Sequence, residues 1–149
     1  MFAPKNILVP TDFSKYSDAA LKLAADMAAT YDANIYFLHA VDNTITRKSI
    51  DYGISYEEIK QLEESSINAS TEKLKKISSH IIKNEKMKVI HVTKIGDPAE
   101  VILKEQKARK IDLIVISSHG RSGIVRYLMG SVATKVTKSA KCPVMLVKI

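Results

Sequence analysis

A glycine-containing segment in the last third of the chain carries residue types that bind anions. It begins with Ser117 to Gly120, passes Gly123, and reaches Gly130 followed directly by Ser131. Glycine lets backbone N–H groups approach a phosphate without a Cβ in the way. A helix starting at Ser131 would add unpaired N–H donors and the positive end of its dipole. The segment predicts a phosphate-binding loop, although glycine turns and a capping serine without a ligand would give the same spacing.

The loop follows a short apolar run that predicts a buried strand. Leu113 to Ile116 is rich in β-branched residues and is too short for a helix. The end of this strand at Ile116 would bring Ser117 to the carboxyl edge of a sheet.

A second strand end, near the start of the chain, offers a carboxylate. The run Asn6 to Val9 is stopped by Pro10, and Thr11 and Asp12 follow as a turn. Asp12 can serve only the turn, as short polar residues often do. Alternatively, it faces a ligand from the carboxyl end of the first strand, and both interpretations stay open at this point.

Hydrophobic periodicity divides the chain into alternating strands and helices. Ser14 or Ser17 is expected to cap the first helix. Asp97, Pro98 and Glu100 mark the start of the third helix as N-cap, first helical residue and capping-box position. Strands are expected at residues 6–9, 33–41, 88–95, 113–116 and 143–147, and helices at 14–31, 56–84, 98–109 and from 131 to about 136.

The segment between the second strand and the second helix predicts a lid. Asp42 to Tyr56 shows no clear period, and its fifteen residues are long for a connection. We expect it to be mobile and to order when a ligand binds. The helix after it should bury one stripe of side chains along its length, comprising Ile59, Leu62, Ser66, Ala69, Leu74, Ile77 and Ile81.

Alternating strands and helices predict a parallel α/β sheet with helices on both faces. A length of 149 residues favours one domain over residues 1–149. In such sheets, ligands bind outside the carboxyl ends of the strands, where the strand order switches. If the first and fourth strands are neighbours there, the turn Pro10–Asp12 faces Ser117 to Gly120 across one crevice.

Composition and charge narrow the function classes. The net charge of +7 comes from 23 basic and 16 acidic residues. The lysines are spread along helices and do not alternate with aromatic residues, so binding to nucleic acid is not favoured. No apolar run approaches the roughly 18 residues of a membrane span, and the N-terminus lacks the pattern of a secretory signal. Cys142 is the only cysteine, which fits a reducing cytoplasm and an inert, partly buried thiol.

Several motifs that would indicate catalysis or metal binding are absent from the sequence. The chain has neither a P-loop nor the G-x-G-x-x-G dinucleotide fingerprint. Its four histidines, His39, His80, His91 and His119, lack metal-ligand spacing. The adjacency of Ser117, Ser118 and His119 does not make a catalytic triad, which is defined by geometry. We therefore predict no catalytic residue and no metal ligand.

The sequence resembles the universal stress protein family along its whole length. The segments that carry the resemblance are Lys5–Ser14, Leu38–Asp42, Gly96–Pro98 and Pro143–Val147. The most specific feature is the family's nucleotide signature, which is glycine, two residues, glycine, nine residues, glycine, then serine or threonine.

Here Gly120, the nine residues Arg121 to Met129, Gly130 and Ser131 fit the larger part of that signature. The first glycine of the signature falls on Ser117. A serine there either crowds a bound nucleotide or donates a hydrogen bond to it. The family also contains a branch that lacks the signature and does not bind ATP.

The resemblance implies an open, Rossmann-like sheet of five parallel strands in the order 3-2-1-4-5. It implies ATP as the ligand, with Mg or Mn as an ion that can accompany the triphosphate. Asp12 and the backbone near Ala40 and Val41 would contact the ribose or adenine, while the glycine loop holds the phosphates. Arg121 and Arg126 would add charge to the loop or remain in solvent. The implied binding residues are Pro10, Thr11, Asp12, Ala40, Val41, Ile116, Ser117, Gly120, Arg121, Gly130, Ser131 and Val132.

Three functions are open on this basis. The first is a cytoplasmic, ATP-binding regulator of a stress response, and the second is an interaction module of the same fold with an empty pocket. The third is a slow ATPase, ranked last because no residue supplies a convincing general base for water. The apolar terminal segment Val144–Ile149 predicts a homodimer, since pairing across a two-fold axis would remove an exposed strand edge, as it does in family members.

Overall fold

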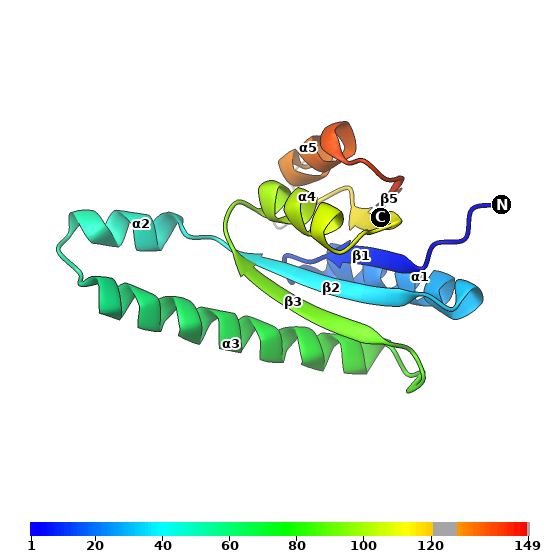
Figure 1. Ribbon diagram of the computed structural model, residues 1–149, viewed down its shortest axis with the longest axis horizontal. Helices are drawn as coiled ribbons and strands as arrows, with labels where there is room; N and C mark the ends of the chain where they lie inside the picture. Colours follow the sequence, from blue (N-terminus) through cyan, green and yellow to red (C-terminus); the bar gives the residue numbers. More distant parts are fainter. Residues whose placement is uncertain (121–127, 149) are drawn as a thin grey trace.

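The computed structural model contains one sheet of five parallel strands in the order β3-β2-β1-β4-β5 (Figure 1). It describes residues 1–120 and 128–148, with the side chains of all of these except Ile45 and Thr46. The strands are β1 (Asn6–Pro10), β2 (Asn34–Val41), β3 (Val89–Ile95), β4 (Leu113–Ser117) and β5 (Val144–Val147). The helices are α1 (Lys15–Tyr31), α2 (Thr44–Asp51), α3 (Tyr56–Ile81), α4 (Pro98–Ala108) and α5 (Ser131–Ser139).

The strand order switches between β1 and β4. β1 pairs in parallel with β2 on one side and with β4 on the other, where Ile7 lies opposite Leu113 and Leu8 opposite Ile114. The chain first adds β2 and β3 on one side of β1, and then crosses to add β4 and β5 on the other. The predicted parallel sheet and its order 3-2-1-4-5 are confirmed.

Helices cover both faces of the sheet because the central strands are apolar on both sides. α1 and α3 pack on the face to which β1 contributes Ile7 and Val9. α4 and α5 pack on the opposite face, to which β1 contributes Leu8 (Figure 1). The two helical layers cover the faces of the central strands, so a ligand can reach β1 and β4 at their carboxyl ends.

Two helices begin at the predicted caps. The Ser14 hydroxyl accepts a hydrogen bond from Ser17 N at 3.3 Å and so caps α1. The Asp97 carboxylate accepts a hydrogen bond from Glu100 N at 3.0 Å, and Pro98 is the first residue of α4. These caps fix where α1 and α4 begin, next to the carboxyl ends of β1 and β3.

Part of the segment predicted as an irregular connection is a helix, so the expectation of four helices is wrong. α2 spans Thr44–Asp51 within residues 42–56. Six of its eight residues are polar, and a helix without an apolar stripe gives no periodic signal. The Asp42 carboxylate accepts a hydrogen bond from Thr44 N at 2.9 Å, which satisfies one donor of the first turn.

α3 extends well beyond the sheet that it covers (Figure 1). Its second half contacts β2 and β3, and Leu74 there is fully buried. In its first half Ile59 is buried as predicted, but Leu62 is 53% exposed, and Ser66 and Ala69, near the middle of the helix, are also exposed. The predicted buried stripe is therefore wrong for Leu62, Ser66 and Ala69. α3 has 26 residues. Like the other helices within the described residues, it is not apolar enough over its length to cross a membrane.

Candidate functional site

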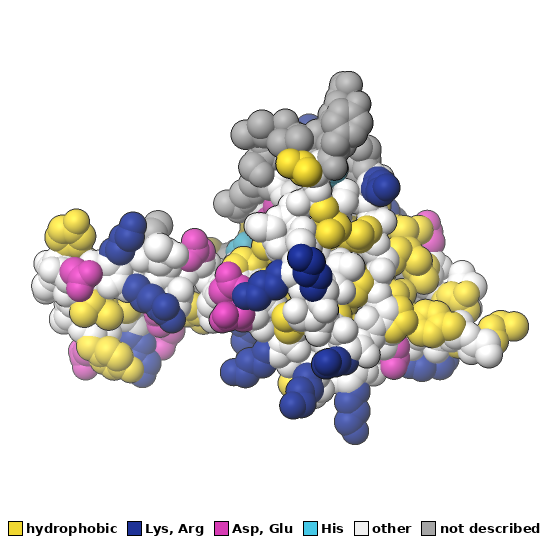
Figure 2. Space-filling view, turned by 90° about the horizontal axis from the view of Figure 1, so that it is seen from above, with side chains coloured by type: hydrophobic (Ala, Val, Ile, Leu, Met, Phe, Trp, Pro, Cys, Tyr) yellow, Lys and Arg dark blue, Asp and Glu magenta, His cyan; other side chains and the backbone are white. Residues whose placement is uncertain are grey.

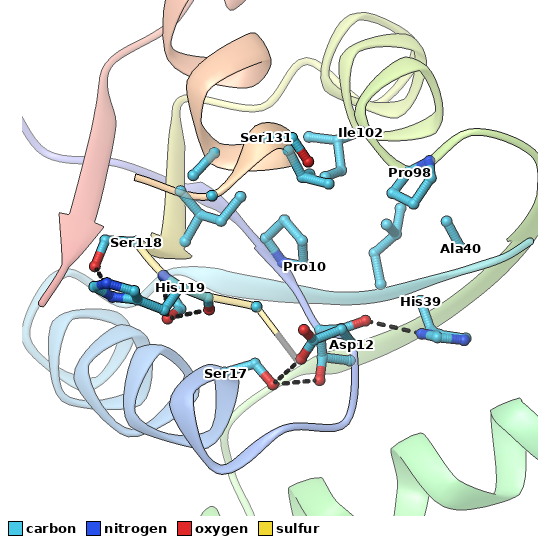
Figure 3. Close-up of a pocket in the computed structure, with 18 residues that line it drawn as sticks. Pro10, Asp12, Ser17, His39, Ala40, Pro98, Ile102, Ser118, His119 and Ser131 are labelled. Carbon is cyan, nitrogen blue, oxygen red and sulfur yellow. Dashed lines mark hydrogen bonds between the residues drawn. The ribbon is translucent and has the colours of Figure 1, made fainter. Parts of the chain in front are cut away.

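A pocket opens at the carboxyl ends of β1 and β4, at the switch point of the sheet (Figure 3). Its volume of about 370 Å³ lies within the range of small-molecule sites. The ends of β1, β2 and β4, the residues after β4 and the first turns of α4 and α5 form its walls. This is the position that the strand pattern predicted for a ligand site.

The pocket gathers most of the residues predicted for the site. Val41, at the end of β2, is not part of the described lining, and Arg121 and Arg126 lie outside the described residues. The predicted residues that do line the pocket are Pro10, Thr11, Asp12, Ala40, Ile116, Ser117, Gly120, Gly130, Ser131 and Val132.

Asp12 is held in the pocket wall by the turn after β1. Its Oδ1 accepts hydrogen bonds from Ser14 N at 2.9 Å and from the Ser17 hydroxyl at 3.3 Å. The Thr11 hydroxyl lies 2.8 Å from the Ser17 hydroxyl, so the turn and the start of α1 form one polar network. A carboxylate fixed in this way has a defined direction before any ligand arrives.

The charge of Asp12 also acts on a second carboxylate, Asp18 of α1. Burial raises the pKa of Asp18, the positive charge of Lys22 opposes that shift, and the negative charge of Asp12 adds to it. A cationic or hydrogen-bond-donating ligand group at Asp12 would therefore also change the electrostatic potential at Asp18, in the first turn of α1.

The Ser117 hydroxyl is turned toward its own loop. It donates a hydrogen bond to the His119 carbonyl oxygen at 2.9 Å and accepts one from His119 N at 3.3 Å. Ser118 Oγ lies 2.9 Å from His119 Nδ1, so two consecutive hydroxyl groups fix the turn after β4. Ser117 is not among the described non-glycine residues with positive φ, so its backbone conformation does not require glycine.

Gly120 and Gly130 differ in what surrounds them. A Cβ added at Gly120 would lie only 3.1 Å from Asp12 Oδ2, which is tighter than an ordinary contact. A Cβ added at Gly130 would lie 3.5 Å from the Ser118 carbonyl oxygen, which is an ordinary contact. Gly130 N donates a hydrogen bond to that oxygen at 2.8 Å. Of the two glycines, only Gly120 has a neighbour that would have to move to admit a Cβ.

The N-terminus of α5 lies at the pocket. Its first helical hydrogen bond runs from Thr134 N to the Gly130 carbonyl oxygen at 2.9 Å. The N–H groups of the residues between them therefore precede the helical ladder and are available to an acceptor outside the helix. Those residues, Ser131, Val132 and Ala133, all line the pocket, so the helix presents donors and its positive dipole end there.

The opposite wall of the pocket is apolar. It is formed by Leu38 and Ala40 of β2, Pro98 and Ile102 of α4, and Ile116 of β4. Figure 3 shows Pro98, Ile102 and Ala40 on one side of the cavity, and Ser118 and His119 on the other. The cavity can thus hold a molecule with a flat apolar part at one end and an anionic part at the other.

Some residues of the pocket wall were not predicted from the sequence. His39 lines the pocket, with Nδ1 2.8 Å from the Thr11 carbonyl oxygen and its ring 4.1 Å from that of Phe13. Pro98 and Ile102 also line it. From the sequence, Pro98 reads as a helix start and Ile102 as a core residue. Their place at the cavity depends on how α4 packs.

The predicted lid does not reach the pocket. No residue between Asp42 and Tyr56 belongs to the described lining, and α2 projects away from the cavity (Figure 1). Ligand-dependent ordering of this segment stays a prediction, and in the structure α2 contacts α3.

Metal binding would depend on the ligand. Within residues 1–120 and 128–148, no group of three or more His, Cys, Asp or Glu side chains is placed to hold a metal ion. Asp12 is the one carboxylate of the described lining. Because Mg²⁺ is commonly held by substrate phosphates together with one or two carboxylates, Asp12 is the side chain that could assist such an ion.

Comparison with known proteins decides the family. The model of the universal stress protein family matches residues 4–148. The chain belongs to the universal stress protein family. The universal stress protein MJ0531 of Methanocaldococcus jannaschii is 36% identical over 145 residues, which cover 97% of this chain and 82% of that protein.

Solved structures of similar proteins share the fold of this universal stress protein. That of the hypothetical protein MJ0577 of the same organism superposes with a TM-score of 0.84 at 28% identity, covering 99% of this chain and 98% of the other. A universal stress protein in complex with cAMP has a TM-score of 0.69 at 21% identity and covers 99% and 98%. One from Archaeoglobus fulgidus in complex with dAMP has a TM-score of 0.61 at 20% identity and covers 99% and 100%. The last two are likenesses of fold.

Proposed function

We propose that this universal stress protein binds an adenine nucleotide, ATP, in the pocket between β1 and β4. The observation that carries the proposal is the combination of two walls in one cavity. Apolar side chains that include Ile102 and Ile116 line the same cavity as a glycine turn and the N-terminus of α5. A base can stack on the first wall while phosphates accept hydrogen bonds from the second.

Each part of the nucleotide has a matching group in the pocket. The Asp12 carboxylate, whose direction is fixed by Ser14 and Ser17, would accept hydrogen bonds from the ribose hydroxyls or from adenine. The backbone at Ala40, which lines the pocket, would lie along the base. Ser131 would donate its hydroxyl and backbone N–H to the phosphates, and Mg or Mn would accompany them.

Two further observations support the assignment. Solved structures of the same fold contain cAMP and dAMP, and both ligands share adenine with ATP. In addition, Gly120 and Gly130 occupy the signature positions of the family, and the structure brings both into one wall. Together they favour a nucleotide over another small anion.

As a regulator, the protein would change partners according to whether its pocket is filled. We propose that it acts in the cytoplasm as one domain and as a homodimer. The two copies would pair through the terminal segment Val144–Ile149, because β5 lies at one end of the strand order, with β4 as its neighbour. The partner proteins remain to be identified by capture with and without ATP.

One observation favours a second candidate function. Ser117 is buried at the position of the first signature glycine and adds a Cβ and a hydroxyl to the cavity wall. If that side chain excludes the nucleotide, the protein is an interaction module that uses the fold without a ligand.

Calorimetry decides between the two functions. We expect saturable heat when ATP is titrated into the purified protein, and strongly reduced heat with Asp12→Ala. Glu72→Ala is the matched control, because Glu72 is an exposed acid paired only with Lys75 among described ion pairs. Mass spectrometry of small molecules released from the purified protein should detect an adenine nucleotide. Absence of heat in both the native protein and Ser117→Gly would instead support the interaction module.

A further inference from the structure

α2, the turn after it and the first half of α3 form an arm that projects away from the sheet. We define the arm as residues 44–66. It is the extension at the left of Figure 1 and the separate lobe at the left of Figure 2. Its two helices contact each other, but the pocket and the layered core lie elsewhere, so neither the fold nor the proposed ATP site explains the exposed surface of the arm.

The arm carries a cluster of exposed hydrophobic side chains. Tyr52 is 86% exposed and Tyr56 is 78% exposed. Ile54 and Leu62 line a shallow hollow beside them. Five of the ten large hydrophobic residues that are exposed in the described chain lie on the arm, namely Ile50, Tyr52, Ile54, Tyr56 and Leu62. Exposed apolar side chains gathered on one projecting element, rather than scattered singly, indicate a contact surface.

Most bases of the arm lie on α2 and most of its acids lie on α3, with Asp51 of α2 and Lys60 of α3 as the exceptions. α2 presents the bases Arg47 and Lys48, which lie about one helical turn before the tip. α3 begins at the tip and is acidic there. Its acids are Glu57, Glu58, Glu63 and Glu64. No ion pair joins the two groups within the described residues, so the bases and acids do not neutralise each other. Of the acids, Glu58 is held by Ser55, whose N and hydroxyl donate hydrogen bonds to its carboxylate.

This arrangement is complementary to itself. Two arms can overlap at their tips in antiparallel fashion about a two-fold axis. The acids at the tip of one arm then lie opposite the bases of the other arm, which are about one helical turn from its tip. The symmetry repeats that contact. The hydrophobic side chains of both tips then lie between the two charged rims, which is the usual layout of an interface.

We propose that the arm is a docking surface for the arm of a second copy of this chain. A tip of this size offers less than the roughly 800 Å² per partner of a stable interface, so the contact alone gives weak, reversible association. Where copies are already paired through β5, the arms would join two such pairs. The proposal does not depend on ATP binding.

Charge reversal tests the proposal by sedimentation velocity over a concentration series from about 10 to about 500 μM. Arg47→Glu/Lys48→Glu leaves Lys60 as the only base of the arm, and Glu57→Lys/Glu64→Lys leaves Asp51, Glu58 and Glu63 as its only acids. We expect each double variant to weaken the arm-dependent association roughly tenfold. An equimolar mixture of the two should restore it, because their arms are complementary again.

A matched control separates the contact from net charge. Lys86→Glu/Lys88→Glu changes the chain's charge by the same amount as the α2 reversal, at exposed positions far from the arm. It should associate like the native protein. Circular dichroism should show unchanged helix content in every variant.

A second measurement locates the contact. In a Cys142→Ser background, Tyr52→Cys should form an intermolecular disulfide faster than Lys22→Cys, an exposed control site on α1. A protein in which neither charge reversal alters association overturns the proposal. So does a mixture that fails to restore association, because the arm would then dock on another surface. Equal rates of cross-linking at the two cysteine positions also overturn it.

Discussion

The Asp12 carboxylate and the Gly120 backbone lie against each other across the switch point of the sheet. A Cβ at Gly120 would approach Asp12 Oδ2 to 3.1 Å, although the two residues are 108 positions apart in the chain. The turn after β1 and the turn after β4 therefore leave no free space for a side chain at Gly120. Any change at Gly120 has to move either the carboxylate or the loop that would face a phosphate.

Gly120→Ala should consequently weaken both the fold and ATP binding. We expect a loss of about 1–2 kcal/mol in the free energy of unfolding, as is usual for overpacking, and roughly tenfold weaker binding of ATP. Chemical denaturation and calorimetry measure the two effects. Gly130→Ala is the control, because its added Cβ makes only ordinary contacts and should change unfolding by less than about 0.5 kcal/mol. Equal stability of the two variants would contradict the close approach of Asp12.

Replacing Ser117 tests the position at which the nucleotide signature departs from glycine. Because its hydroxyl holds the backbone of His119, Ser117→Gly should loosen the turn and weaken ATP binding by about 0.5–1.5 kcal/mol, or roughly two- to tenfold. Ser117→Ala retains the Cβ and removes only the hydroxyl, so it should lose a similar amount. Tighter binding in Ser117→Gly but not in Ser117→Ala would show that the side chain crowds the ligand instead.

Ser131→Ala should weaken ATP binding without altering the fold. Ser131 is exposed at the first position of α5, and its hydroxyl would donate a charge-assisted hydrogen bond to a phosphate. The loss of such a bond amounts to about 1.5–3 kcal/mol, or roughly ten- to a hundredfold in affinity. Calorimetry with ATP and with adenosine separates the contributions, since adenosine has no phosphate and its binding should not change. A parallel loss for adenosine would point to damage elsewhere in the pocket.

His91 should make stability depend on pH. It lies on β3, and its Nε2 is 2.7 Å from the hydroxyl of the buried Ser78 on α3. Burial, and to a lesser extent the charge of Lys75, lower the pKa of His91 below its ordinary value of 6.5. The unfolded chain therefore takes up a proton first as the pH falls, and stability present above pH 6.5 is lost below it.

The measurement is the free energy of unfolding between pH 7.5 and pH 5 for the native protein, His91→Gln and His80→Gln. We expect the decline toward low pH to be shallower in His91→Gln. His80→Gln removes a histidine ring from an exposed position of the same helix and is the control for the substitution itself. Superimposable slopes for native protein and His91→Gln would exclude His91 as the titrating group.

A proline at Leu146 tests the proposed homodimer. The carbonyl oxygens of Pro143 and Val147 accept hydrogen bonds from Ile114 N and Ser118 N of β4. Because backbone groups alternate in direction along a strand, Leu146 N–H points away from β4, toward the open edge. Leu146→Pro removes that donor and leaves the bonds to β4 in place. We expect light scattering to show a monomer for Leu146→Pro and a dimer for Met145→Leu, whereas dimers of both would locate the interface elsewhere.

Much of the fold was determined by local sequence. Short β-branched runs such as Leu113 to Ile116 indicate buried strands. They alternate along the chain with amphipathic helices, and this alternation predicts a parallel α/β sheet. The caps at Ser14 and Asp97 were equally local, since a side chain bonds a backbone group three residues away. The resemblance to universal stress proteins added the strand order, which periodicity does not encode.

The arm shows where local pattern fails. Ile59, Leu62 and Leu74 recur at helical spacing, yet Leu74 is buried by the sheet and Leu62 is exposed. Periodicity identifies the face of a helix that can be buried, but it does not show how far along the helix a partner extends. α2 was missed for a related reason, because a short polar helix has no apolar face to reveal it.

The candidate site also has features that the sequence determines and features that only the tertiary structure determines. The sequence by itself determined the chemical groups, namely a carboxylate after the first strand, glycines after the fourth and a serine at a helix start. Only the tertiary structure decided that Asp12 touches Gly120, that the Ser117 hydroxyl turns toward His119, and that Ile102 closes the apolar wall. Those relations join residues from different elements, and their geometry depends on how helices and strands pack, which no spacing along the chain records.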